Sequence, residues 1–134
     1  MTRRLAWRWA WPRTAATRIR GRSKLPCWHW DIAHCRAGDK GDTSNIGLIA
    51  RSDALLPHLL GQATEDRVGN WLGHLVKGKV TRYDLPGIGA VNFVCEAALG
   101  GGGMASLRND PLGKGMAQIL LAMPVQVPKA LLPS

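Results

Sequence analysis

The stretch His34–Leu48, "HCRAGDKGDTSNIGL", places Gly38 and Gly41 among charged side chains between two apolar runs. The run before it, residues 28–35, alternates weakly between apolar and polar residues, as a strand does. The run after it, residues 45–51, is apolar and too short for a helix of its own. We therefore predict two strands joined by a glycine-bearing loop.

Helices are expected next. Residues 52–60 carry leucines at helical spacing, with Ser52 or Asp53 as N-cap, Pro57 in the early turn and Gly61 as the break. Residues 64–77 make the strongest helix of the chain, because acidic residues follow the N-cap Thr64 and a lysine precedes the final glycine.

The second half repeats the order of strands and then a helix. Residues 79–85 and 90–99 are expected strands, joined by a turn at Pro86-Gly87. Residues 109–123 are an expected helix with Asp110 as N-cap, and residues 125–134 could add a short strand. This order lacks the regular alternation of a doubly wound sheet. It predicts an α+β two-layer sandwich, an antiparallel sheet with helices on one face.

Length and charge limit the domain organisation. The 134 residues, 46% hydrophobic, suffice for one small domain with a core. The net charge of +9 lies almost wholly in residues 1–30, which hold eight basic residues and no acidic one. The remainder is nearly neutral, which argues against a nucleic-acid-binding domain. We expect an extension at 1–27, a domain at 28–128 and a tail at 129–134.

Residues 1–27 leave several interpretations open: a disordered arm, a membrane-surface or nucleic-acid tail, or an upstream stretch included by a misplaced start codon. Their apolar stretch is too interrupted for a signal peptide, and no run approaches the ~20 residues of a membrane span. Three cysteines without C-x-x-C spacing predict neither a disulfide framework nor a structural zinc site. We expect a soluble, cytoplasmic protein that binds no nucleic acid, membrane or metal.

Two glycine loops form the candidate ligand site. Glycines permit positive φ and allow successive backbone N–H groups to point at one anion, such as a phosphate, a CoA tail or an oxyanion. If the loops meet at one edge of the sheet, the ligand-binding residues are Arg36, Gly38, Lys40, Gly41, Thr43, Ser44, Asn45, Gly100, Gly101, Gly102, Gly103 and Arg108. The acid/base candidates are Asp39, Lys40 and Asp42. The alternatives are a first loop locked by its own aspartates and a second that is a flexible linker.

Three stretches together resemble a known family: "DIAHCRAGDKGDTSNIGLIAR", "RYDLPGIGAVNFVCEAALGGGGMASLR" and "DPLGKGMAQILLAMPV". They are similar to the small ferredoxin-fold domain associated with the acyclic terpene utilisation protein AtuA. The resemblance covers roughly residues 30 to 125. It implies a ferredoxin-like α+β sandwich without an iron–sulfur cluster, and a setting in the catabolism of branched or acyl-CoA-linked substrates. It supplies no catalytic residue. The family has a small or aliphatic residue where this chain has Cys35, and no counterpart of residues 1–27.

Two functions follow as hypotheses. In the first, the chain is a non-catalytic or site-completing partner of a large AtuA-like subunit, and forms a homo-oligomer when isolated. In the second, it is a small enzyme acting on an anionic acyl or acyl-CoA substrate through the glycine loops. No cofactor is predicted, and a CoA ester is the expected ligand in the second case.

Overall fold

The computed structural model of the chain describes residues 24–132. The strands are β1 (Lys24–Trp28), β2 (Ala33–Lys40), β3 (Thr43–Ala50), β4 (Val80–Leu85), β5 (Ala90–Cys95) and β6 (Pro124–Pro128). The helices are α1 (His29–Ile32), α2 (Leu56–Gln62), α3 (Glu65–Trp71) and α4 (Met116–Leu121), with 3-10 turns η2 (Pro86–Ile88) and η3 (Lys129–Leu131). Most of the expected extension lies outside the described residues, whereas residues 24–27 belong to β1.

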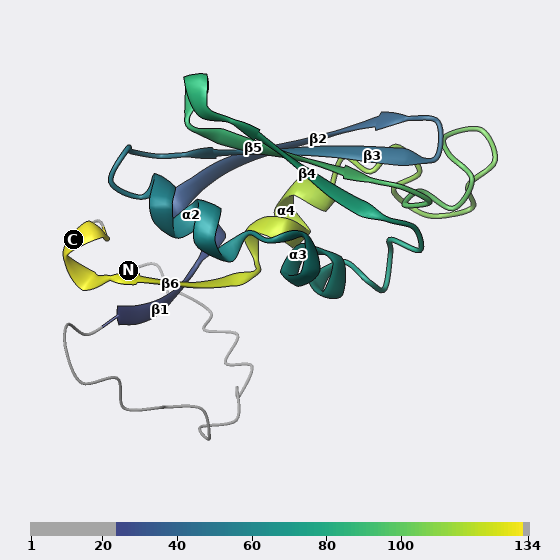
Figure 1. The fold of residues 1–134 in the computed structure, drawn as a ribbon. Coiled ribbons are helices and arrows are strands. Elements are labelled where there is room, and N and C mark those ends of the chain that lie inside the picture. Colours follow the sequence, from purple (N-terminus) through teal and green to yellow (C-terminus); the bar gives the residue numbers. More distant parts are fainter. Residues whose placement is uncertain (1–23, 133–134) are drawn as a thin grey trace, which may run out of the picture.

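A four-stranded sheet in the order β2-β3-β5-β4 forms one layer, and every neighbouring pair is antiparallel. The helices lie on one side of this sheet, as Figure 1 shows. Helix α4 contacts β2 and β3, α3 contacts β4, and α2 contacts β6. The predicted α+β sandwich is confirmed.

The core lies between the sheet and the helices. Alternate residues of β3 and β5 point inward and are buried, which is the period of a sheet with one covered face. Large buried side chains of the sheet include Ile46, Leu48, Val91 and Phe93, and those of the helical layer include Ile32, Leu59, Val68, Leu72 and Leu120. Each contributes about 1.5–3 kcal/mol by its removal from water.

The loop predicted between the first two strands is instead a hairpin. Strands β2 and β3 pair without interruption up to Lys40 opposite Thr43, which leaves only Gly41 and Asp42 as the turn. Gly41 has a φ of 60°, the conformation that a two-residue hairpin requires at its first turn position. The charges of this stretch do not break the ladder, because strand residues alternate between the two faces and charged side chains reach solvent.

Other element boundaries also differ from the prediction, and one of them is the end of β5, which lies at Cys95 rather than at residue 99. Residues 29–32 form helix α1 rather than strand, because the Asp31 carboxylate accepts a hydrogen bond from the Trp28 N–H and closes one turn. Gly61 lies within α2, which begins at Leu56 rather than after Ser52 or Asp53. The predicted helix 64–77 begins as expected, since the Thr64 hydroxyl caps it, but it ends at Trp71.

The ends of the helices are set by tertiary contacts. The N–H groups of Lys77 and Gly78 donate to the carbonyls of Ala97 and Glu96, so this segment pairs beside β5 instead of continuing α3. The start of α4 also differs from the prediction. Gly113 has a φ of 64°, which interrupts the helix predicted from Asp110, so α4 begins only at Met116.

Strands β1 and β6 form a separate two-stranded antiparallel ribbon, with Lys24 opposite Pro128 and Trp28 opposite Pro124. The short C-terminal strand predicted by the sequence is confirmed as β6. Its partner was not anticipated, because residues 24–27 were assigned to the extension.

The buried ring of His29 gives the domain a pH-dependent stability. Its Nδ1 donates to the Met123 carbonyl at 2.6 Å, and its side chain is fully buried. Burial, the largest effect, lowers the pKa of His29 below its ordinary value. The unfolded chain takes up a proton near pH ~6.5, while the folded chain resists protonation until lower pH. The contribution of His29 to the free energy of unfolding is therefore fully present above pH ~6.5 and is lost as the pH falls below that value.

We expect the free energy of unfolding, measured by urea denaturation, to decrease between pH 7.5 and pH 5.5. The variant His29→Gln keeps a donor for Met123 and does not titrate, so it should show a shallower decrease. Equal slopes for the two proteins would contradict this role of His29.

Candidate functional site

The two glycine loops meet at one end of the sheet, as predicted. The Asp42 carbonyl at the hairpin tip accepts a hydrogen bond from the Ala98 N–H at 2.9 Å. The Asp42 Oδ1 accepts from the N–H groups of Leu99 and Gly101, at 3.0 and 2.8 Å. The backbone N–H groups of the glycine loop thus bind an anion, as the sequence predicted, but this anion is the Asp42 carboxylate of the same chain. We call this contact the tip junction, formed by residues 41–42 and 98–102.

Three of the four consecutive glycines have backbone conformations that favour glycine. Gly100, Gly101 and Gly102 have φ values of 64°, 103° and 87°, where L-residues are strained. A Cβ on Gly102 would also lie 2.6 Å from the Gly41 carbonyl oxygen. A Cβ on Gly103 would lie 2.9 Å from the Leu112 side chain. The run is thus a fixed turn rather than a flexible linker.

Arg108 supports the tip junction from the other side. Its guanidinium donates to the carbonyls of Ala98 and Leu75, at 2.5 and 3.2 Å. The Arg108 N–H donates to the Ser106 hydroxyl at 3.2 Å. The side chain expected to meet a bound anion therefore binds the backbone of its own domain.

The remaining predicted site residues divide between the two faces of the hairpin. Arg36, Lys40 and Asn45 are exposed, and they alternate with residues whose side chains point toward the helices. Gly38 pairs with Asn45 on β3, and nothing would touch a Cβ at that glycine. The solvent-exposed face of β2 thus carries the cationic side chains of Arg36 and Lys40 on either side of Gly38, which has no side chain.

Three further predicted site residues make contacts within the domain: Asp39, Thr43 and Ser44. Thr43 pairs with Lys40 at the tip, and the buried Ser44 donates to the Gly38 carbonyl at 3.3 Å. The Asp39 carboxylate accepts from the Lys114 ammonium at 3.0 Å. Lys114 was absent from the predicted site because the sequence gives no sign that the loop before α4 reaches β2. Ligand binding by all of these residues stays a prediction.

A second polar cluster, not predicted from the sequence, lies at the opposite edge of the sheet. A shallow depression there is lined by Thr64, Glu65, Asp66, Arg82, Tyr83 and Asp84. Arg82 donates to the Asp84 carboxylate at 2.6 Å, and this hydrogen bond lowers the pKa of Asp84. Arg82 also donates to the carbonyls of Leu60 and Ala63. Glu65 accepts the Arg82 N–H at 2.7 Å and covers a donor of the edge strand. The cluster joins the α2–α3 connection to β4.

The thiols of the domain are weak nucleophiles. Burial raises the pKa of Cys35 to about 12 and that of Cys95 to about 11. We expect iodoacetamide at pH 8 to label both cysteines at least ~100-fold more slowly in the folded protein than in urea, since the thiolate is the reactive form. Peptide mass spectrometry would measure the rates, and rapid labelling of folded Cys35 would contradict the expectation.

The part of the chain that the structure describes holds neither a cluster of metal ligands nor a membrane-spanning helix. Residues 24–132 contain no group of three or more histidine, cysteine, aspartate or glutamate side chains arranged to hold a metal ion. No helix among them is long and apolar enough to cross a membrane.

A comparison with protein families gives a match, whereas comparisons with individual proteins give none. No curated protein and no solved structure matches the chain significantly. The family described as the AtuA ferredoxin-like domain matches residues 30–126, which include both glycine loops, the whole four-stranded sheet and the first part of β6. The chain belongs to the AtuA ferredoxin-like domain family.

Proposed function

We propose that the chain is the small, site-completing partner of a large AtuA-like protein in the catabolism of branched or acyclic acyl-CoA-type substrates. The observation that carries the proposal is the tip junction. Two charged groups are used within the domain there: Asp42 of the tip junction binds the N–H groups of the glycine loop, and Arg108 beside the junction binds the Ala98 carbonyl. Such an arrangement fixes the shape of a surface loop, which is what a docking element needs.

The test is reconstitution of the full chain with the purified large AtuA-like protein of the same organism. Size-exclusion chromatography with light scattering should show one complex at tens of micromolar, and the chain alone should form a homo-oligomer. Turnover of a branched acyl-CoA should increase when both proteins are present. Separate elution of the two proteins, or equal turnover by the small chain alone, would overturn the proposal.

The second candidate is a small enzyme that acts on an anionic acyl or acyl-CoA substrate. Arg36 and Lys40 favour it, because both are exposed on the same face of β2 and neither is paired with a carboxylate among residues 24–132. Two such cations beside the hairpin tip suit a phosphate or carboxylate group.

For this candidate we expect Lys40→Ala to weaken acetyl-CoA binding about 5–10-fold in calorimetric titrations, as loss of one exposed charge contact does. The melting temperature should stay unchanged, because Lys40 is exposed. Lys129→Ala, a change of the same charge in the η3 turn, is the matched control. Equal acetyl-CoA affinity of the two variants and the wild type would exclude this site.

A further inference from the structure

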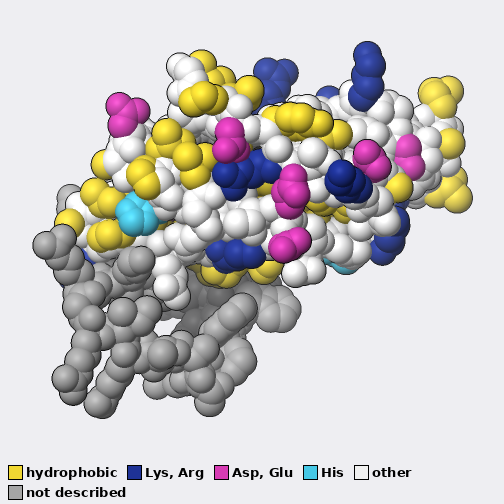
Figure 2. Space-filling model, viewed as in Figure 1, with side chains coloured by type: hydrophobic (Ala, Val, Ile, Leu, Met, Phe, Trp, Pro, Cys, Tyr) yellow, Lys and Arg dark blue, Asp and Glu magenta, His cyan; other side chains and the backbone are white. Residues whose placement is uncertain are grey.

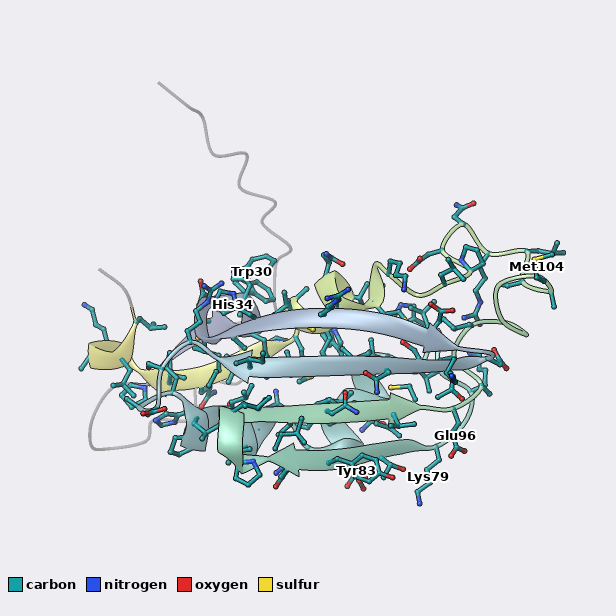
Figure 3. The ribbon with its side chains drawn as sticks, turned by 90° about the horizontal axis from the view of Figure 1, so that it is seen from above. Trp30, His34, Lys79, Tyr83, Glu96 and Met104 are labelled. Atoms are coloured by element: carbon teal, nitrogen blue, oxygen red, sulfur yellow. The ribbon has the colours of Figure 1, made fainter. Side chains whose placement is uncertain are left out.

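One face of the four-stranded sheet has no covering layer among residues 24–132. The helices pack on the other face, and Figure 3 looks onto the uncovered side, where no helix lies in front of the strands. Alternation along each strand places there the side chains that neighbour the buried ones. We call this surface the open face, formed by the outward side chains of residues 34–38, 45–49, 81–85 and 90–94.

The strand register aligns four residues of the open face in one row across the sheet. Arg36 pairs with Gly47, Gly47 with Asn92, and Asn92 with Tyr83. Tyr83 is 54% exposed, and Arg36 has no carboxylate partner among residues 24–132. The row thus carries a long side chain at each edge of the sheet and none at Gly47.

The fold itself does not require a glycine at position 47. The ladder runs through Gly47 without interruption, and its φ is not positive. A Cβ there would meet only the Asn92 Oδ1, at 4.0 Å, which is an ordinary contact. Glycine inside a strand weakens the strand, and such glycines mark places where a ligand or another backbone comes close. A body that packs on the open face therefore comes closest at Gly47.

A second copy of the chain matches this row. A two-fold axis parallel to the strands, between β3 and β5, places β2 over β4 and β3 over β5 of the other copy. Arg36 then lies over the partner's Tyr83, and Asn92 lies over the partner's Gly47. Because the symmetry doubles each contact, this row supplies two cation–π pairs and two amides that fill the spaces above the glycines.

The neighbouring row adds apolar contacts. Ile49 and Leu85 are 45% and 41% exposed, and both pair with Ala90 between them. The same axis places Ile49 over the partner's Ala90 and Leu85 over the partner's His34. Removal of these side chains from water on both copies favours association.

The charges at the other end of the sheet are compatible with a second copy. Lys40, Lys79 and Glu96 are exposed there, and Figure 3 shows Lys79 beside Glu96. In the two-fold arrangement, each Lys40 lies over the partner's Lys79, one strand away from the partner's Glu96. The carboxylate offsets part of the repulsion between the two ammonium groups. Figure 2 shows Lys and Arg side chains among hydrophobic ones along the upper surface, where the sheet lies.

Single-stranded nucleic acid and a membrane fit the open face less well. Sheets that bind single strands stack the bases on two or three aromatic side chains. The open face has Tyr83 but no phenylalanine or tryptophan, since the chain's only phenylalanine, Phe93, is buried. A membrane surface takes up a continuous apolar face. Arg36 and Asn92 interrupt the apolar side chains here.

We propose that the isolated chain forms a two-fold symmetric dimer in which the open faces of two copies stack on each other. Arg36 contacts the partner's Tyr83 at the edges, and Asn92 occupies the space over the partner's Gly47 near the axis. This inference deepens the homo-oligomer expected above for the chain alone. It does not involve the large AtuA-like protein, so its failure leaves the formation of that complex to its own test.

Light scattering and sedimentation velocity of the full chain test the dimer. The wild type should have twice the chain mass at tens of micromolar. Gly47→Glu places two carboxylates beside the axis and should weaken the dimer at least ~100-fold. Its circular dichroism should match the wild type, because a Cβ at position 47 is tolerated. The matched control is Gly61→Glu on α2, where nothing lies within 4 Å of a Cβ, and it should dimerise like the wild type.

An exchange of the two edge residues tests the symmetry itself. Tyr83→Arg alone sets two arginines against each other and should weaken the dimer about 10-fold or more. The double variant Arg36→Tyr/Tyr83→Arg restores the pair in the reverse order. Its affinity should return to within about threefold of the wild type.

A monomeric wild type would overturn the inference, and a Gly47→Glu dimer as tight as the wild type would overturn the assignment of the surface. A wild type that is monomeric alone, yet binds the large AtuA-like protein through Gly47, would assign the open face to that protein instead. Binding of an oligothymidylate strand by a monomeric wild type, lost in Gly47→Glu, would assign it to nucleic acid.

Discussion

Gly102→Ala is expected to lower the free energy of unfolding by about 3–4 kcal/mol. The new Cβ would lie 2.6 Å from the Gly41 carbonyl oxygen, a backbone atom that cannot rotate away. The φ of 87° adds strain for any L-residue. Urea denaturation at pH 7.5 would measure the loss, and the hairpin should separate from the glycine loop as the strain is relieved.

The control for this variant is Gly61→Ala. Gly61 lies inside α2, and a Cβ there would touch nothing within 4 Å. Alanine at a helix interior stabilises by up to ~1 kcal/mol relative to glycine. The two substitutions are chemically identical and should change stability in opposite directions. A Gly102→Ala protein as stable as the wild type would show that the two loops do not touch in solution.

Asp42→Ala should lower the free energy of unfolding by about 2–4 kcal/mol. Each hydrogen bond to a charged group contributes ~1.5–3 kcal/mol, and removing the carboxylate leaves the N–H of the buried Leu99 without its acceptor. Hydrogen exchange should show faster exchange at Leu99 and Gly101, because both amides lose the protection of the Asp42 oxygen.

Asp42→Asn separates the geometry from the charge. The asparagine keeps an acceptor oxygen in place, so it should lose only about 1 kcal/mol. Asp53→Ala, at an exposed position before α2, should change stability by less than ~0.5 kcal/mol. If Asp42→Ala behaves like Asp53→Ala, the tip junction contributes nothing to the fold.

The sequence predicted the fold class because most of its elements are encoded locally. Thr64 and the acidic residues after it place the start of α3, and the alternation of Val91, Phe93 and Cys95 identifies β5 and its buried face. The two glycine motifs also predicted correctly that the loops would meet. Periodicity and capping depend on neighbours in the chain, so these features are visible without a structure.

The features that were missed depend on distant partners. The end of α3 is set by hydrogen bonds from Lys77 and Gly78 to residues 97 and 96. The role of Arg108 could not be inferred either, because its acceptors at Ala98 and Leu75 are brought together only by the fold. In the same way, nothing local distinguishes Asp42 as the anion that fills the glycine loop from Asp39, which pairs with Lys114.

The β1–β6 ribbon constrains the order in which the domain is completed. It joins the first described strand to the last one, so its two halves are separated by nearly the whole folding unit. A contact of such long sequence separation closes late, after the local hairpin β2–β3 has formed. During synthesis on the ribosome, β1 is made before β6 and therefore has no pairing partner until β6 has been synthesised. During that interval the newly made chain exposes β1 as an unpaired strand.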